Sequence, residues 1–413
     1  MKTRLVILAC WFVLLCSLGA NAQLTAHCPY AGHAQDLICL IPDVTQTGAT
    51  PLAGFNTTIA QVLGQLPLAV PNSGFVLGFK NGIPVDLTEN LGSVLTERGN
   101  TIGRGKFFLG FTFQRFVFTT VDGNKLSSLP FFSTNSTTGI SNYSVDSLHA
   151  NINQYTSFVA VGLTDKVDLS LSLPFQRISV SGGRSNVEAW NASGTFAGTQ
   201  PSVYAPGAAT GFGDLLLNVK ASVLPGEGRS RLAAGGEIRF PTGNVYNLLG
   251  TGAYGFKPYF VYSRLIGRFT PHVNAGYQWN GRSVLRPNPN GGNLRLPDSF
   301  DYSAGMDVGL VKRKASVVVD IVGQRYFNAP RVLTPVAVPA SNPCNAGTPS
   351  CSGLTSVNVG TGDYFVDNLS VGLKLNPVKN LILSGNALVR LDSAGLRPNR
   401  FVPLVGISYL FGK

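Results

Sequence analysis

The sequence is short of charged residues and methionine, and beyond its first twenty residues it has no long hydrophobic run. Of 413 residues, 13% are Asp, Glu, Lys or Arg, whereas soluble domains carry about 25%. Methionine occurs twice, and no later stretch approaches the roughly 18 apolar residues of a membrane-spanning helix. The shortage of charge excludes intrinsic disorder and a long coiled coil, and the lack of apolar runs excludes a helical membrane protein.

Glycine and aromatic residues are abundant instead. The chain has 48 Gly, and 10% of its residues are Phe, Trp or Tyr. Together with the scarcity of charge, this composition indicates a large all-β chain, which is either a soluble sandwich or a membrane barrel.

The first 22 residues resemble a secretory leader. Lys2 and Arg4 precede an apolar run over 5–18, and Ala20-Asn21-Ala22 forms a small-x-small cleavage site. We therefore expect a cleaved signal peptide at 1–22, a mature chain that begins at Gln23, and export through the inner membrane.

Four cysteines remain after the leader, namely Cys28, Cys39, Cys344 and Cys351. Four cysteines allow three disulfide pairings in an oxidising compartment. We favour the two short loops, Cys28 with Cys39 and Cys344 with Cys351. Their spacing does not match that of a zinc site, so we expect no metal and no cofactor.

Apolar and polar residues alternate over most of the chain. In one run Val167, Leu169 and Leu171 alternate with Asp168 and Ser170, which gives a strand one apolar and one polar face. Most runs have 9 to 15 residues, the length of a tilted strand that crosses a bilayer rather than that of a usual soluble strand. Twelve runs occur, at approximately 106–121, 148–162, 167–180, 214–224, 232–240, 255–265, 269–280, 300–310, 315–326, 364–375, 381–392 and 401–411.

The gaps between these runs alternate strictly between long and short. They contain 26, 4, 33, 7, 14, 3, 19, 4, 37, 5 and 8 residues. Outer-membrane barrels have tight periplasmic turns, longer outer loops and an even number of strands. The pattern predicts a transmembrane antiparallel up-and-down β-barrel of about 12 strands in a Gram-negative outer membrane, formed by residues 106–413.

The polar faces of these strands should line the lumen. They bring acids and bases inside in nearly equal number, so two interpretations stay open: charge pairing that fills the lumen, or contacts that select a solute. The lumen-facing candidates are Lys220, Glu237, Arg239, Lys257, His272, Asp301, Asp307, Asp320, Lys374 and Arg390, with Asp168 and Asp392 beside them.

The first and last strands have unusual aromatic patterns. Phe107 and Phe111 lie on one face of the first strand while Phe116 and Phe118 lie on the other, which a register change or a buried contact with the N-terminal segment would explain. The last strand ends near Phe411, similar to the C-terminal signal that the barrel-assembly machinery reads. We therefore expect that machinery as a partner.

Residues 23–105 lack the barrel pattern and are expected to form an N-terminal plug or periplasmic segment. A helix is expected over 55–66. Asn81-Gly82 between short apolar runs predicts a hairpin near 75–83. That hairpin would either sit in the lumen as part of a plug, which we favour, or extend the barrel to 14 strands.

The centre of the chain carries a recognisable series of motifs. These are Gly211-Phe212-Gly213-Asp214, then Lys220 in a strand, then Pro241-Thr242-Gly243-Asn244, then Leu249-Gly250-Thr251-Gly252. The series resembles the MetA-pathway phenol-degradation family of outer-membrane barrels, which is related to fatty-acid and aromatic uptake channels. The family usually has Asp where this chain has Asn244. The resemblance implies passive uptake of small hydrophobic or aromatic compounds, and a turn-forming role for Gly211, Gly213, Asp214, Pro241, Thr242 and Gly243.

Other functions have weaker support. His149 and His272 lack the His-x-Ser pattern of barrel phospholipases, so we expect no catalytic residues and no enzyme. A structural or adhesive barrel without transport is the second hypothesis. Arginines in the expected outer loops could bind lipopolysaccharide phosphates, so outer-membrane lipid and lipopolysaccharide are expected partners and nucleic acid is not. These arginines are Arg184, Arg282, Arg286, Arg295, Arg331, Arg397 and Arg400.

Overall fold

The computed structural model describes most of the chain from residue 91 onward. It covers 91–411 except 135–137, 194, 225–228, 289, 313, 333–335, 338–353 and 379, and it also covers residues 30, 32–33, 35–40, 62, 66, 77–80 and 83–86. The expected signal peptide, Cys28, Cys344, Cys351 and nearly all of the expected helix at 55–66 lie outside the described residues. Cys39 is disulfide-bonded, and its pairing with Cys28 stays a prediction.

The chain forms a closed antiparallel barrel of twelve strands, as the sequence predicts. Two segments, β9 (Val203–Phe212) and β10 (Leu215–Ser222), both pair with β7 and together form one barrel strand, and β10 closes the ring against β7. The other barrel strands are β3 (Phe107–Val121), β6 (Ser141–Gly162), β7 (Val167–Trp190), β11 (Ser230–Phe240), β12 (Gly255–Arg264), β13 (Phe269–Asn280), β16 (Ser299–Val311), β17 (Ala315–Val332), β20 (Val359–Val378), β21 (Leu381–Arg390) and β23 (Phe401–Phe411).

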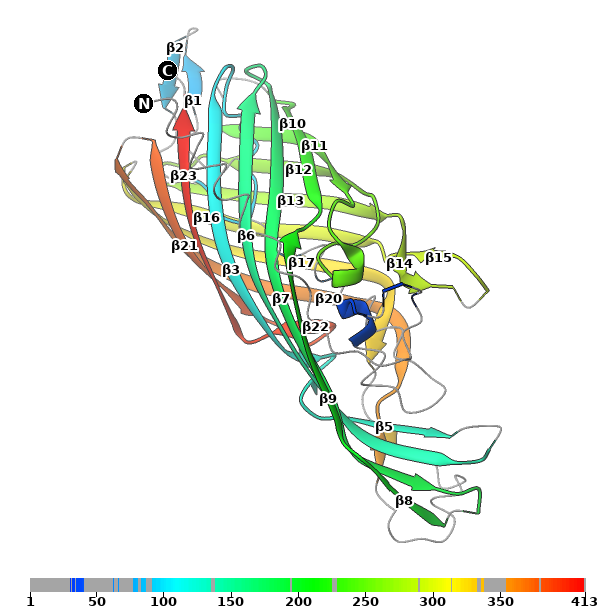
Figure 1. Ribbon diagram of the computed structural model, residues 1–413. Coiled ribbons are helices and arrows are strands. Elements are labelled where there is room, and N and C mark those ends of the chain that lie inside the picture. The colour runs from blue at the N-terminus through cyan, green and yellow to red at the C-terminus, as the bar shows by residue number, and fades with distance from the viewer. Residues whose placement is uncertain are drawn as a thin grey trace, which may run out of the picture.

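The expected N-terminal hairpin forms, but not where we favoured it. The strands β1 (Leu77–Lys80) and β2 (Ile83–Asp86) pair with each other in a separate two-stranded sheet. The alternative of 14 barrel strands is therefore wrong. Figure 1 places the hairpin beyond the strand ends, beside the C-terminus, rather than in the lumen. Each hairpin strand has four residues, too few to span a membrane.

Several strands are longer than the alternation predicts. The strands β6 and β7 have 22 and 24 residues and extend well past the barrel on the side away from the termini (Figure 1). Much of two expected outer loops is therefore strand, and Asp392 lies just past β21 rather than within it. The connections between the barrel strands contain a 3-10 helix, η1 (Val245–Asn247), and several short strands. These strands are β4 (Asn124–Lys125), β5 (Leu129–Thr134), β8 (Phe196–Gln200), β14 (Arg282–Pro287), β15 (Asn293–Arg295), β18 (Val336–Ala337), β19 (Thr355–Ser356) and β22 (Leu396–Pro398).

Arg184 and Arg331, expected in loops, lie in barrel strands, while four other expected loop arginines lie in short strands between barrel strands. Arg184 lies within β7, 3.5 Å from the Asp146 carboxylate, and Arg331 lies within β17. Arg397 lies in β22 and is buried. The remaining three within strands are Arg282 and Arg286 in β14 and Arg295 in β15.

The two faces of the barrel wall differ as a membrane barrel requires. Outward side chains such as Val319 and Ile321 on β17 are exposed, whereas the inward side chains of Val318 and Asp320, which alternate with them, are buried. No helix among the described residues is long and apolar enough to cross a membrane.

Burial in the lumen explains the two-sided aromatic pattern of β3. Its pairing with β6 keeps one register from Phe107 to Phe118. The inward side chains of Phe116 and Phe118 belong to a buried cluster that includes Leu95 and Ile102 of the N-terminal segment. The explanation by a register change is therefore wrong, and a buried contact with the N-terminal segment stays a prediction.

Candidate functional site

All ten lumen-facing candidates lie at inward positions of the barrel wall. Two groups form: Lys220, His272, Asp307, Asp320 and Lys374 are buried near the short-turn end, whereas Glu237, Lys257 and Asp301 lie together farther along the lumen. Arg239 joins a third network toward the outer end. Arg390 stands apart, where its Nη1 donates to Thr120 Oγ1 at 2.8 Å.

Residues 91–102, which we call the lumen segment, run inside the barrel at the short-turn end. Side chains on three barrel strands accept hydrogen bonds from its backbone amides. The amide of Leu91 donates to Ser316 Oγ at 2.8 Å, and that of Ile102 donates to Asp168 Oδ2 at 3.0 Å. The amide of Gly99 donates to the hydroxyl of Ser263 on β12. The segment is thus held across the lumen by polar contacts, without joining the sheet.

Two buried ion pairs join the lumen segment to the wall. Arg98 Nε donates to Asp307 Oδ2 at 2.8 Å, and these side chains are 3% and 0% exposed. Glu97 lies 2.9 Å from Lys220 Nζ, which also donates to the carbonyl of Arg98. The sequence pattern missed Glu97 and Arg98 because they lie outside any strand; their signal is an isolated pair of opposite charges in a stretch otherwise without charge.

His272 lies under the same segment. Its Nε2 is 2.9 Å from Asp320 Oδ1 and 2.8 Å from Thr96 Oγ1, while Thr96 Oγ1 donates to Asp320 Oδ2 at 3.2 Å. Lys374 Nζ donates to the carbonyl of Ser93. These contacts complete a buried polar cluster at the inner end of the lumen.

The Thr96, His272 and Asp320 group is not a catalytic triad. In a triad the hydroxyl and the carboxylate bind opposite nitrogens of the imidazole. Here both face Nε2, and Nδ1 lies 3.2 Å from the carbonyl oxygen of Thr270 and 3.6 Å from Asp307 Oδ2. Thr96, His272 and Asp320 are all buried, so the group forms part of the contact between the lumen segment and the wall.

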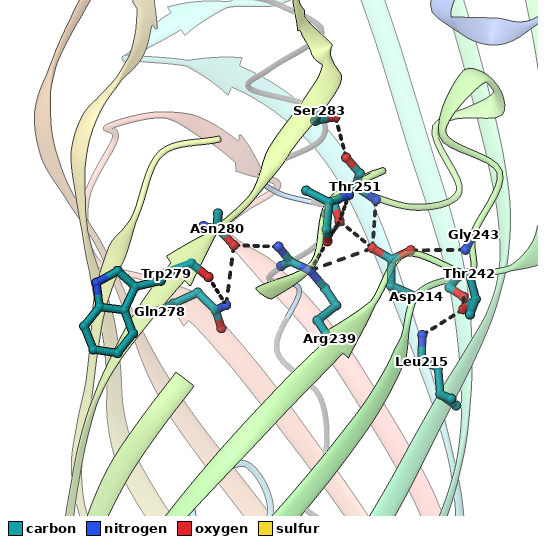
Figure 2. A network of polar contacts seen from close by, with 12 residues as sticks. Asp214, Leu215, Arg239, Thr242, Gly243, Thr251, Gln278, Trp279, Asn280 and Ser283 are labelled. Atoms are coloured by element: carbon teal, nitrogen blue, oxygen red, sulfur yellow. Dashed lines mark hydrogen bonds and ion pairs between the residues drawn. The ribbon is translucent and has the colours of Figure 1, made fainter. Parts of the chain in front are cut away.

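The central motifs converge on Asp214 at the outer end of the lumen, as Figure 2 shows. Asp214 Oδ1 accepts from the amide of Gly243 at 3.1 Å, and Oδ2 accepts from the amide and hydroxyl of Thr251 at 2.8 and 2.5 Å. Arg239 lies 3.8 Å from Asp214 and donates to Asn280 Oδ1 at 2.5 Å. The network fastens the loop 241–254 to the inner wall.

The glycines of the motifs permit this close packing. A Cβ at Gly250 would lie 2.3 Å from Asp214 Oδ1, and one at Gly243 would lie 2.6 Å from the carbonyl oxygen of Leu249. Thr242 Oγ1 adds a bond to the carbonyl of Gly213 at 2.9 Å. The structure gives these motif residues loop-anchoring contacts.

Residues 35–40 lie beside this loop and help to cover the outer mouth of the lumen. Asn247 Nδ2 donates to Asp36 Oδ1 at 2.7 Å, and the ring of His33 stacks on Tyr246 with a centroid distance of 3.4 Å. Leu37 and Ile38 are fully buried. Figure 1 shows this short blue helix next to η1 at the outer end of the barrel.

A cavity of about 220 Å³ lies in the lumen between the lumen segment and the outer network. Leu95 and Glu97 of the lumen segment bound it on one side, and Arg239 of the outer network bounds it on the other. Tyr259 OH donates to Asn218 Oδ1 at 2.7 Å in its wall. The lining also includes Leu66, Leu216, Glu237, Lys257, Gln278, Asp301, Ser303, Val322, Gln324, Val366 and Asn368.

The cavity wall combines paired charges with apolar patches. Lys257 Nζ lies 3.1 Å from Glu237 Oε1 and 3.5 Å from Asp301 Oδ2. Among the described residues, no group of His, Cys, Asp and Glu has an arrangement that could hold a metal ion.

The fold and its lumen define an outer-membrane β-barrel with the lumen segment bound to its inner wall. Residues 145–327 match the family model described as "Putative MetA-pathway of phenol degradation". The matched residues contain all the central motifs, so the family resemblance predicted from those motifs is confirmed. No curated protein matches the chain.

Solved structures with a similar fold are outer-membrane proteins. The COG4313 outer membrane channel from Pseudomonas putida F1 is 14% identical, with 77% of this chain and 100% of that chain covered and a TM-score of 0.47. The CymD monoaromatic hydrocarbon channel is 8% identical, with 76% and 89% covered and a TM-score of 0.33. A Pseudomonas aeruginosa FadL homologue is also 8% identical, with 74% and 89% covered and a TM-score of 0.29. These likenesses are too distant to assign a solute to this chain.

Proposed function

We propose that this protein is an outer-membrane channel for the passive uptake of small hydrophobic or aromatic compounds, and that the lumen segment is its gate. The cavity between the lumen segment and the outer network is the observation that carries the proposal. A barrel that served only as a scaffold has no need of such a space in its lumen.

The volume of the cavity suits a single aromatic ring. An engineered apolar cavity of about 150 Å³ binds benzene, so 220 Å³ has room for one substituted ring. Leu95 and Val322 supply apolar contacts, while the hydroxyl of Tyr259 and the amide of Asn218 could bind a phenolic oxygen. The name of the matched family, which refers to phenol degradation, agrees with this solute class.

Glycines at both ends of the lumen segment support a gating role. Gly92 and Gly103 have φ angles of +85° and +91°, and Gly105 has a φ of +71°. Glycine adopts these conformations without strain and can leave them easily. The segment could therefore swing away from the wall while β3 stays in place.

A structural or adhesive barrel without transport is the second candidate. The buried ion pairs of Arg98 and Glu97 favour it, since they hold the lumen segment against the wall. We propose that the protein is not an enzyme, in agreement with the geometry around His272.

Two substitutions on β16 distinguish the two candidates. Ser303 lines the cavity and is 7% exposed, whereas Met306 faces outward and is 40% exposed. Ser303→Trp should fill the cavity and reduce uptake of radiolabelled toluene, by cells with an intact lipopolysaccharide leaflet, to that of cells without the protein. Met306→Trp is the matched control and should keep wild-type uptake. Equal uptake by all three proteins and by cells without the protein would support the scaffold.

The remaining assignments are proposals of the same kind. Residues 23–105 form an N-terminal plug or periplasmic segment, and 106–413 form the barrel. The aromatic end of β23 supports recognition by the barrel-assembly machinery, and the outward apolar wall supports contact with outer-membrane lipid and lipopolysaccharide. Most of the charged residues that the structure describes inside the barrel are in ion pairs, which does not favour nucleic acid as a partner.

A further inference from the structure

The outer wall of β3, β6, β7 and β9 carries an aromatic row. Phe113, Tyr155, Phe175 and Phe212 are consecutive cross-strand partners. The rings of Phe113 and Tyr155 are 5.0 Å apart, and those of Phe175 and Phe212 are 5.4 Å apart. Such girdles mark the level where a barrel leaves the hydrocarbon core of the membrane.

The next outward position along each strand, toward the outer end, is polar. Arg115 pairs with Asn153 across the sheet, and Asn153 pairs with Arg177. Both arginines are exposed. Because adjacent strands are about 4.8 Å apart, the two backbones lie about 10 Å apart, with Asn153 between them. We call these three residues the arginine row.

No acidic side chain among the described residues neutralises the arginine row. Within the described residues, neither Arg115 nor Arg177 forms an ion pair or a hydrogen bond through its side chain. Another outward arginine, Arg325 on β17, differs: it lies 3.1 Å from Asp363 and 5.2 Å from the centre of the Phe327 ring. The positive charge of the arginine row is thus available to a ligand.

A shallow groove lined by both polar and apolar residues continues outward from the arginine row. It has a volume of about 360 Å³. Asn151 and Ser179 pair at the first step beyond the row, and His149 and Ser181 pair at the next. Tyr204, Pro206 and Ala208 of β9 complete the wall, and apolar atoms make up most of its lining. The amide, hydroxyl and imidazole groups among them are suited to sugar hydroxyls.

The three levels together match one kind of lipid. The apolar wall below the aromatic row suits acyl chains, the arginine row suits phosphate, which guanidinium binds bidentately, and the groove suits a sugar. We propose that the arginine row and the groove form a binding site for the phosphorylated disaccharide of lipid A in the outer leaflet. The proposal rests on the outer-membrane location alone and is independent of transport. It moves lipopolysaccharide binding from the loop arginines to named positions on the wall.

Native mass spectrometry of the detergent-purified full chain tests this site with hexa-acylated lipid A. The test variant is Arg115→Gln/Arg177→Gln. Arg264→Gln is the matched control, because Arg264 is an exposed arginine at the opposite, short-turn end of β12. We expect lipid A to bind the double variant at least tenfold more weakly than the wild type, which corresponds to about 1.4 kcal/mol, and the control to bind within twofold of the wild type.

Two further ligands separate the phosphate from the sugar. Lipid A without its phosphates should bind at least tenfold more weakly, and so should phosphatidylglycerol, which has phosphate but no disaccharide. Equal binding of phosphatidylglycerol would overturn the glycolipid assignment, and equal binding of dephosphorylated lipid A would overturn the role of the arginines. If the double variant does not fold, Asn153→Glu places a carboxylate between the arginines and should weaken lipid A binding equally. Wild-type affinity in a folded variant contradicts the proposal.

Discussion

The ion pair of Arg98 with Asp307 should decide how often the lumen opens. Arg98→Gln removes the charge of a side chain that is 3% exposed and leaves Asp307, which is 0% exposed, without its nearest cation. Loss of one member of a buried pair costs about 3 to 5 kcal/mol. This contact exists only when the lumen segment is bound to the wall. The substitution should therefore raise the free energy of the closed state relative to the open state.

The lower bound, about 3 kcal/mol, corresponds to more than a hundredfold change in an equilibrium. In planar bilayers the open probability of Arg98→Gln should therefore rise about a hundredfold above that of the wild type. Arg98→Gln/Asp307→Asn removes the uncompensated charge and should recover most of the closure, since a neutral replacement of a buried pair is often tolerated. Arg325→Gln, at an exposed pair on the outer wall, is the control and should behave as the wild type.

Two outcomes would refute this reasoning. An unchanged open probability in a folded Arg98→Gln protein would show that the lumen segment is not the barrier. Equal opening in the single and double variants would show that the unpaired Asp307 charge is not what drives the segment away.

Three further predictions concern the outer end. Asp214→Asn removes a carboxylate that accepts hydrogen bonds from Gly243 and Thr251. Since hydrogen bonds to charged groups contribute about 1.5 to 3 kcal/mol, limited proteolysis of the loop 241–254 should become at least tenfold faster. An unchanged rate would contradict the role of Asp214 in holding this loop. Burial raises the pKa of Asp146, beyond the membrane, from 3.8 to about 7. The outer parts of β6 and β7 therefore release this proton at lower pH when unfolded than when folded. Their stability should fall from pH 4 to pH 7 and then level off. Hydrogen-exchange protection of these strands measures this change, and Asp146→Asn should abolish the dependence of their stability on pH. Peptide mapping without reduction should find Cys28 joined to Cys39, and a different partner for Cys39 would overturn that pairing.

The barrel could be predicted from sequence because its signal is local. Each strand sees lipid on one face and a polar lumen on the other, so the period of two is visible in runs such as that from Val167. The signal ends where the strand leaves the membrane. The alternation predicts a strand over 148–162, whereas β6 begins at Ser141. Residues 141–147 show no regular apolar face, so the pattern predicts a loop there.

The closed ends could not be predicted in the same way. The contact of Arg98 with Asp307 joins residues 209 apart in the chain, and that of Thr251 with Asp214 spans 37 residues. No periodicity encodes such pairs. The motifs did indicate the network around Asp214, because the glycines that pack against its carboxylate form a recognisable sequence pattern. The lumen segment has no comparable pattern apart from its two adjacent charged residues.

The central claim is that an aromatic solute occupies the cavity between the lumen segment and the outer network. Anomalous diffraction from crystals of the full chain with 4-bromophenol tests it most directly. We predict a bromine peak inside the lumen, among Leu95, Tyr259 and Arg239, and its loss in Ser303→Trp. Bromine found on the outer wall alone, with the cavity empty, would contradict the account.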